Sequence, residues 1–236
     1  MGTFVSLTII ILAMVIQAFL QTSPGVFSIF YHHALGKTTA KKADDRALSF
    51  ILGQEIAIAI FFLTTYLIIS FLSAEKISLD TVFMWVLSGF FLTEALFMFF
   101  CYFRSDKKSK NTTKLFYPKV LTKNIIYHIE HVKNRTDTIA LGFITAALEF
   151  IFILPLFIIS SIAILHISSR ASFVFIIAYI IIATLPLFTI RTLFRTNHNL
   201  AEIQRFRVKK KFFFRLVLTI SYLALGILTF ISGASI

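Results

Sequence analysis

The chain has 236 residues, of which 58% are hydrophobic and 14% are charged, and its formal net charge is +12. Soluble domains carry about 25% charged residues, so this chain has too few polar side chains to cover a surface that faces water. A soluble nucleic-acid-binding domain is excluded despite the positive charge, because the basic residues lie in short segments between apolar runs.

Six apolar runs are each long enough to cross a bilayer as an α-helix. About 20 mainly apolar residues span roughly 30 Å of hydrocarbon. Their unbroken length excludes a β-barrel, whose strands alternate over about ten residues. We therefore predict an all-α membrane protein with a single transmembrane domain over residues 1–236. The predicted spans are about 4–31, 47–72, 81–103, 138–165, 171–190 and 212–235.

The first run is long for one straight span and contains the element Thr22-Ser23-Pro24-Gly25. Pro24 removes a backbone hydrogen-bond donor and Gly25 adds flexibility, so we predict a first helix that is broken at Pro24-Gly25. Breaks of this kind are tolerated in membranes where they line a cavity or are buried in protein. The alternative is that the element is the cytosolic end of a short first helix.

Basic residues gather in alternate loops. Segments 32–46, 104–137 and 191–215 hold four, nine and eight of the 23 Lys and Arg residues, and only Lys76 and Arg170 lie elsewhere. By the positive-inside rule these three segments face the cytosol. We therefore predict a multi-pass protein of the cytoplasmic membrane, with both termini outside and a long cytosolic loop at 104–137.

Three predicted spans lie on each side of the long loop. An odd number of spans in each half places the halves in opposite orientations across the membrane. The layout is thus compatible with two inverted three-helix repeats, although no convincing internal sequence identity accompanies it.

Three carboxylates lie inside apolar runs: Glu55, Glu94 and Glu149. Apart from Arg215 at the start of the last one, no Lys or Arg lies within a predicted span to pair with them. An ionised carboxylate at the bilayer centre costs about 2.5–3.5 kcal/mol even on lenient scales, so we expect each to hold a proton, bind a cation or face water. All of those states can be coupled to transport. The alternative is a protonated Glu that hydrogen-bonds a neighbouring helix.

Polar residues recur four positions apart in two of the spans. Gln17 and Gln21 share one stripe of the first helix, and Thr145 and Glu149 share one stripe of the fourth. We expect both stripes to face the interior of the bundle, where they pack or line a path. The predicted pathway for a solute or ion consists of Gln17, Gln21, Ser23, Pro24, Gly25, Glu55, Glu94, Thr145, Glu149 and Pro155.

The sequence His128-Ile129-Glu130-His131 is a weak candidate for a metal site. On a helix His128 and His131 share a face while Glu130 points elsewhere, and no third ligand is evident. We therefore expect no metal site and no cofactor. The expected partners are membrane lipids and a small solute or ion, without nucleic acid, and a homodimer stays open.

The order of these features resembles the lysine exporter (LysE) superfamily of small six-span transporters. The matching pieces are Thr22-Ser23-Pro24-Gly25, Gly36-Lys37, Gly53-Gln54-Glu55, and Gly142 to Glu149 with Pro155. The family more often has Pro-Gly-Pro, where this chain has Val26 in place of the second proline, and Gly-Asp, where it has Gly53-Gln54-Glu55. The resemblance implies a transporter fold and leaves the substrate open. Thiol-relay members need paired cysteines, which the single Cys101 excludes.

Three interpretations follow, in decreasing order of support. The first is a secondary transporter, an exporter of a small solute or ion coupled to protons or cations through Glu94 and Glu149. The second is a non-transporting membrane scaffold, or a component of envelope lipid handling, that binds partners through its basic cytosolic face. The third is an intramembrane enzyme, which we do not expect because the sequence has neither Gly-x-Ser-x-Gly nor His-Glu-x-x-His.

Overall fold

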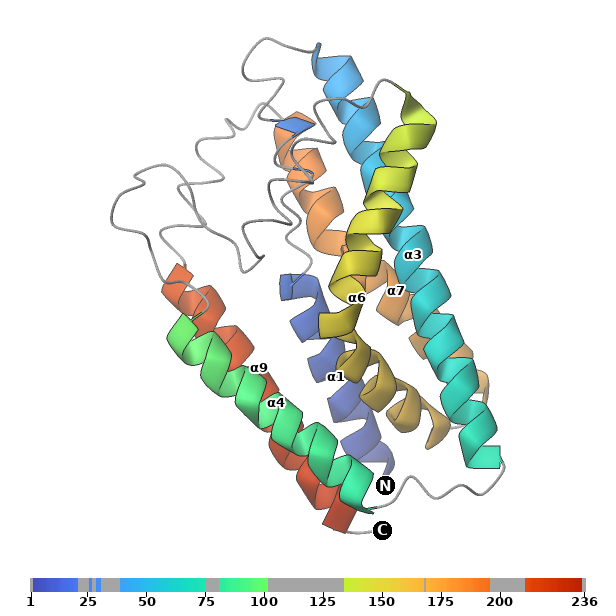
Figure 1. The fold of residues 1–236 in the computed structure, drawn as a ribbon, viewed down its shortest axis with the longest axis vertical. Coiled ribbons are helices and arrows are strands. Elements are labelled where there is room, and N and C mark those ends of the chain that lie inside the picture. The colour runs from blue at the N-terminus through green and yellow to red at the C-terminus, as the bar shows by residue number, and fades with distance from the viewer. Residues whose placement is uncertain are drawn as a thin grey trace.

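The computed structural model describes residues 2–20, 26, 29–30, 39–74, 81–101, 134–167, 169–195 and 211–234. All the regular secondary structure within these ranges is helical, which confirms the all-α prediction (Figure 1). The helices named below are α1 (Thr3–Leu20), α3 (Ala40–Ala74), α4 (Thr81–Cys101), α6 (Arg135–Leu165), α7 (Ser169–Arg195) and α9 (Lys211–Ala234).

Five of these helices, α1, α3, α4, α7 and α9, are each long and apolar enough to cross a membrane. The sixth, α6, reaches that length only if its parts Arg135–Phe150 and Ile153–Leu165 count as one span, because the helix axis bends by 79° between them. The chain is therefore a polytopic membrane protein with five such helices among the described residues, or six if the bent helix is included. The count of six and the inverted repeats stay predictions.

Pro155 lies inside α6, close to the bend. Proline lacks the N–H that would donate to the carbonyl four residues earlier, and its ring collides with that carbonyl. That carbonyl belongs to Ile151, at the junction between the two straight parts of α6. The helix is thus interrupted in its middle, where polar backbone atoms lose their partners.

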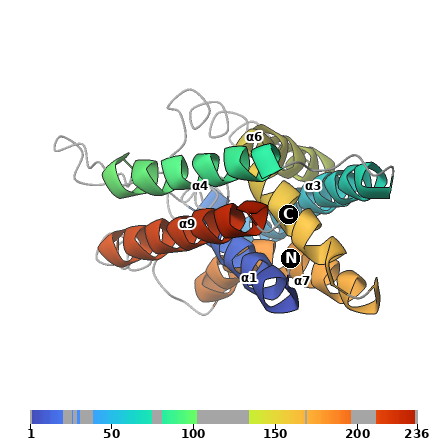
Figure 2. The same cartoon turned by 90° about the horizontal axis from the view of Figure 1, so that it is seen from below.

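Helices α1, α3, α6 and α7 pack together as one group (Figures 1 and 2). In Figure 1, α3 and α6 run side by side in the same direction, and α7 runs opposite to them. Aromatic rings from three of the helices meet at Phe62, whose ring centroid lies 5.2 Å from that of Phe157 and 4.4 Å from that of Tyr179. These rings belong to an apolar core shared by α3, α6 and α7.

Helices α3 and α6 approach closely at two glycines. A Cβ on Gly53 would overlap the carbonyl oxygen of Ile139, and a Cβ on Gly142 would overlap the carbonyl oxygen of Phe50. Small residues at such positions let the backbones of membrane helices come into direct contact. We call this pair of contacts the glycine crossing, and it fixes the register of α3 on α6.

Helices α4 and α9 form an antiparallel pair. The Ser88 hydroxyl of α4 donates to the carbonyl oxygen of Gly226 in α9 at 2.8 Å, and Trp85 stacks on Phe230 with ring centroids 5.8 Å apart. Helix α9 also packs on α1, which joins the pair to the other four helices.

We expect Ser88→Ala to weaken the α4–α9 pair modestly. The hydroxyl is buried and its bond crosses between helices, and such bonds contribute on average about 0.6 kcal/mol and at most about 1.7 kcal/mol in membranes. Reversible unfolding in mixed micelles measures the loss. Thr93→Ala is the control, because the Thr93 hydroxyl donates within α4 to Gly89. Equal losses in both variants would contradict a specific role for the interhelical bond.

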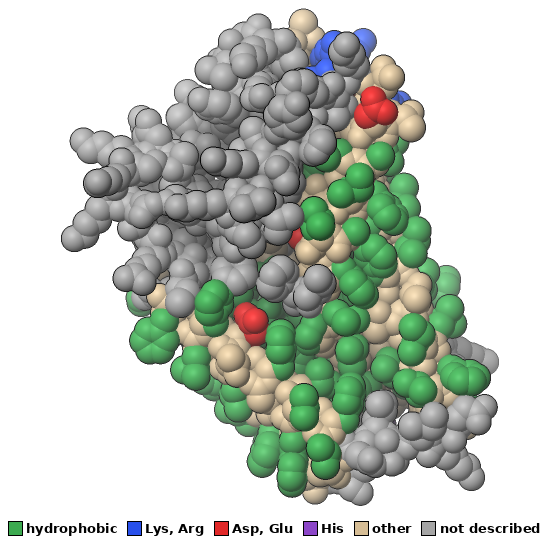
Figure 3. Space-filling view, viewed as in Figure 1, with side chains coloured by type: hydrophobic (Ala, Val, Ile, Leu, Met, Phe, Trp, Pro, Cys, Tyr) green, Lys and Arg blue, Asp and Glu red, His purple; other side chains and the backbone are tan. Residues whose placement is uncertain are grey.

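Basic side chains gather at one end of the molecule, which we call the basic end (Figure 3). The space-filling view shows Lys and Arg at its top and apolar side chains covering the described helices below. Both termini lie at the opposite end (Figure 1). The side of the membrane that the basic end faces stays a prediction. The Lys and Arg residues at this end whose side chains the structure describes are Lys41, Lys42, Arg46, Arg135, Arg191 and Arg195.

Candidate functional site

The apolar interior is divided into two clusters. The first, which we call the basic-end cluster, consists of Val26, Ile29, Phe30, Ala43, Ala47, Phe50, Ile51, Leu141, Leu187 and Ile190. The second and larger one, which we call the large cluster, lies further from the basic end. Its members on α1, α3, α6 and α7 include Ile16, Ile58, Phe62, Ile153, Phe157, Tyr179 and Ala183.

Buried polar side chains lie between the two clusters on α3, α6 and α7, and another lies on α1. They are Gln17 on α1, Gln54 on α3, Thr145 and Glu149 on α6, and Thr184 on α7, with 0%, 0%, 1%, 4% and 1% of their surface exposed. On α3, α6 and α7 each lies after the last member of one cluster and before the first member of the other. On α1, Gln17 follows Ile16, the last buried member of the large cluster on that helix, while Phe19 and Leu20 also pack against this cluster. We call these five residues the polar layer.

Contacts between helices place Gln54, Thr145 and Thr184 at a similar level. A Cβ on Gly142 would lie 3.2 Å from the backbone nitrogen of Gln54, so α3 and α6 meet at this level. Helix α7 is held to α3 by an ion pair between Asp44 and Arg191 on one side and by the ring stack of the large cluster on the other. Gln54 lies about midway between these two contacts on α3, as Thr184 does on α7.

Helices α6 and α7 each contain a proline within six residues of a polar-layer side chain. Helix α6 bends just after Glu149, and α7 contains Pro186 two positions after Thr184. Interrupted helices free backbone carbonyls and amides, and membrane proteins tolerate this where the backbone is buried in protein or lines a cavity. Polar side chains beside interrupted helices are typical of substrate sites in transporters.

The two glutamines of the polar layer have no hydrogen-bond partners among the described residues. The side-chain nitrogen and oxygen of both Gln17 and Gln54 are buried and unpaired. The hydroxyl of Thr145, in contrast, donates to the carbonyl oxygen of Leu141 within α6 at 2.8 Å. A buried amide without hydrogen-bond partners destabilises the folded state by about 1–3 kcal/mol. The amides of Gln17 and Gln54 are therefore available to bond to a polar solute.

We expect Gln54→Met to raise the free energy of unfolding by about 1–3 kcal/mol, because it removes an unpaired buried amide while keeping most of the side-chain volume. Unfolding in mixed micelles measures the gain. Ile58→Met, one turn further along α3 in the large cluster, controls for the effect of methionine itself. A loss of stability in Gln54→Met beyond that of the control would mean that the amide is paired in the folded protein.

The structure places the predicted pathway residues in three sets. Gln17, Thr145 and Glu149 lie in the polar layer. Glu55 is half-buried beside Gln54 on α3, and Pro155 is half-buried in α6. Gln21, Ser23, Pro24 and Gly25 lie outside the described residues.

Glu94 lies on a helix that does not contribute to the polar layer. It is half-buried on α4, which packs along α9, whereas Glu149 is buried on α6, which packs along α3. The two carboxylates that the sequence suggests as coupling groups therefore lie on different helix pairs. Gln54 and Thr184 belong to the polar layer and were not among the predicted pathway residues. Thr184 is a lone polar residue in an apolar run, whereas Gln54 lies in the Gly53-Gln54-Glu55 motif.

No group of three or more His, Cys, Asp or Glu side chains that could hold a metal ion occurs within the described ranges. The weak candidate at His128, Glu130 and His131 lies outside them. The polar layer contains one carboxylate and otherwise neutral side chains, so its chemistry is that of hydrogen bonding and proton exchange.

Comparison with known proteins finds no family model, no curated protein and no solved structure that matches this chain. The resemblance to the lysine exporter superfamily thus rests on the short motifs alone.

Proposed function

We propose that this protein is a secondary transporter of the cytoplasmic membrane that exports a small solute or ion, coupled to protons or cations. The observation that carries the proposal is the polar layer, in which four helices bury five polar side chains, four of them between two apolar clusters. Polar and ionisable residues inside a membrane bundle are costly, and they mark the paths of substrates and ions.

Glu149 is the proposed coupling group, because it is the only ionisable member of the polar layer. Protonation removes the cost of keeping a charge away from water, so the protonated and ionised forms of the protein favour different packings of the helices. Binding and release of one proton at Glu149 would in this way bias the protein towards one side of the membrane.

Gln17 and Gln54 are the proposed solute-binding groups. Each amide offers two donor hydrogens and an acceptor oxygen, and neither amide is paired within the described residues. They come from α1 and α3, so a solute that bonds to both would link two helices. Such a solute shifts the conformational equilibrium only by the difference in its affinity for the two packings.

The proposed orientation follows from charge. The basic end faces the cytosol by the positive-inside rule, so both termini face outwards. The motifs around Pro24-Gly25, Gly53 and Gly142 that resemble the lysine exporter superfamily support the transporter class and the direction of export.

Reconstitution tests the proposal. Purified protein in proteoliposomes is offered a panel of labelled amino acids and divalent metal ions, and uptake is compared with that of protein-free vesicles. We expect uptake of one class of solute to exceed that of the empty vesicles. Absence of uptake across the panel, with the protein folded and monodisperse, would favour the membrane scaffold instead.

A further inference from the structure

We infer that the Asp44–Arg191 ion pair and the basic-end cluster form a gate that closes the polar layer from the basic end. The moving part of this gate is the last segment of α7, residues 187–195. The inference rests on the proposed transport function, because a gate is needed only where a solute must be admitted to one side at a time.

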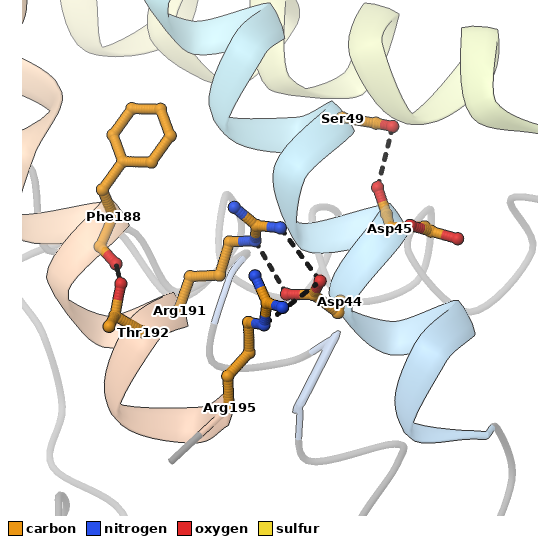
Figure 4. A network of polar contacts seen from close by, with 7 residues as sticks. All are labelled: Asp44, Asp45, Ser49, Phe188, Arg191, Thr192 and Arg195. Carbon is orange, nitrogen blue, oxygen red and sulfur yellow. Dashed lines mark hydrogen bonds and ion pairs between the residues drawn. The ribbon is translucent and has the colours of Figure 1, made fainter.

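The ion pair joins the beginning of α3 to the end of α7 (Figure 4). Arg191 Nε donates to Oδ1 of Asp44 at 2.7 Å, and Arg191 Nη2 donates to Oδ2 at 2.9 Å. Nε of Arg195 lies 4.0 Å from the same Oδ2. A guanidinium that meets a carboxylate through two parallel bonds fixes geometry as well as charge. Asp44 thus holds two successive turns of α7 against α3.

The same segment of α7 carries the apolar part of the gate. Leu187 and Ile190 are members of the basic-end cluster. Phe194 stacks on Phe30 with ring centroids 3.9 Å apart and an interplanar angle of 18°. Ten residues of α3 separate Asp44 from Gln54, about 15 Å at 1.5 Å per residue, and the basic-end cluster fills this distance. Opening the gate therefore requires this segment to leave α3.

Pro186 separates the segment from the rest of α7. Proline interrupts the ladder of backbone hydrogen bonds, and proline positions are where membrane helices bend. On the other side of the gate, the glycine crossing holds α3 to α6 by direct backbone contact. The segment after Pro186 is consequently the part that can swing while α3 stays in place.

The Asp44–Arg191 ion pair is only partly buried, as expected for a contact that opens and closes. The side chains of Arg191 and Asp44 are 17% and 20% exposed. Fully buried pairs are strongly destabilising when one partner leaves, whereas pairs in contact with water separate at small cost. Half-buried at the end of the bundle, this pair is specific in geometry and still able to break.

A cysteine in the polar layer reports the state of the gate. Thr184→Cys is introduced into a Cys101→Ser background, and a membrane-impermeant thiol reagent is applied from the side of the basic end. We expect slow modification in this parent. Asp44→Asn or Arg191→Gln should increase the modification rate about fivefold or more, since either change removes the ionic contact. Asp45→Asn is the matched control, because Asp45 is exposed and points away from Arg191 (Figure 4).

Two further variants separate gating from a general loosening of the fold. The exchanged pair, Asp44→Arg with Arg191→Asp, should restore slow modification. Arg191→Lys keeps the charge without the forked contact and should modify at an intermediate rate, which keeps the test decisive where Arg191→Gln does not fold. Equal rates in the parent and all these variants would overturn the gate, as would an exchanged pair that modifies as fast as the single variants.

The rate of cysteine modification does not depend on transport, so the gate and the transport function are tested independently. Solute uptake without any change in modification would overturn the gate alone. Modification that follows the expected pattern, in a protein that moves no solute of the panel, would support the gate and count against the transport proposal.

Discussion

Glu149→Gln is expected to abolish solute accumulation driven by a pH gradient while solute exchange continues. Glutamine keeps the shape of the side chain but cannot release a proton. The Glu149→Gln protein resembles the protonated state at all times, so it can carry solute between its two packings without moving a proton. Accumulation in proteoliposomes should fall about tenfold or more, which corresponds to a loss of coupling of about 1.4 kcal/mol or more.

Glu94→Gln is the matched control for this result. Glu94 is also a carboxyl inside a predicted span, but it lies on α4 beside α9 rather than in the polar layer. We expect Glu94→Gln to retain most of the accumulation that Glu149→Gln loses. Equal losses would show that both carboxylates act in coupling, and full accumulation in Glu149→Gln would contradict its proposed role.

Gly142→Ala is expected to have the largest effect on stability. Its Cβ would overlap the carbonyl oxygen of Phe50, and a backbone atom cannot step aside as a flexible side chain can. The helices must separate, which costs about 1–3 kcal/mol or more and disturbs the register that places Gln54 and Thr145 at one level. Gly53→Ala should act in the same way, since its Cβ would overlap the carbonyl oxygen of Ile139.

Gly89→Ala separates this steric effect from the general effect of replacing a helical glycine. Nothing lies within 4 Å of a Cβ at Gly89, on α4. The variant should be neutral or more stable by about 0.5–1 kcal/mol, because alanine restricts the unfolded chain. Unfolding in mixed micelles compares the variants. A Gly142→Ala protein as stable as Gly89→Ala would contradict the glycine crossing.

Apolar length predicts the helices well because a membrane requires about 20 apolar residues for each span. It does not predict where the helices end. Helix α3 begins at Ala40 rather than near residue 47, and α7 continues to Arg195 rather than ending near residue 190. The additional turns contain Asp44 and Arg191, which pair with each other, so these extensions depend on a contact between helices that hydropathy does not register.

Proline positions were visible in the sequence, but their structural effects were only partly predictable. Helix α1 ends at Leu20, and the described residues Val26, Ile29 and Phe30 are buried in the basic-end cluster. The predicted break at Pro24-Gly25 lies outside the described residues and stays a prediction. Pro155 marks the fourth span, yet the 79° bend of α6 depends on how its two parts pack against other helices.

Only part of the polar layer can be predicted from the spacing of residues along a single helix. Thr145 and Glu149 could be recognised as a stripe because they lie one turn apart. Gln54 and Thr184 have no such partner on their own helices. Their place in the layer comes from the register between helices, which the glycine crossing and the Asp44–Arg191 pair determine.

The most direct test of the central claim is the movement of ions that accompanies the solute. Proteoliposomes that enclose a pH-sensitive or Na⁺-sensitive dye are given each solute of the panel, with no ion gradient imposed. For one class of solute, the wild-type protein should produce a change in internal pH or Na⁺ that is absent with Glu149→Gln and in protein-free vesicles. An identical signal in the wild type and Glu149→Gln, or uptake of solute without any ion movement in the wild type, would contradict coupling through the polar layer.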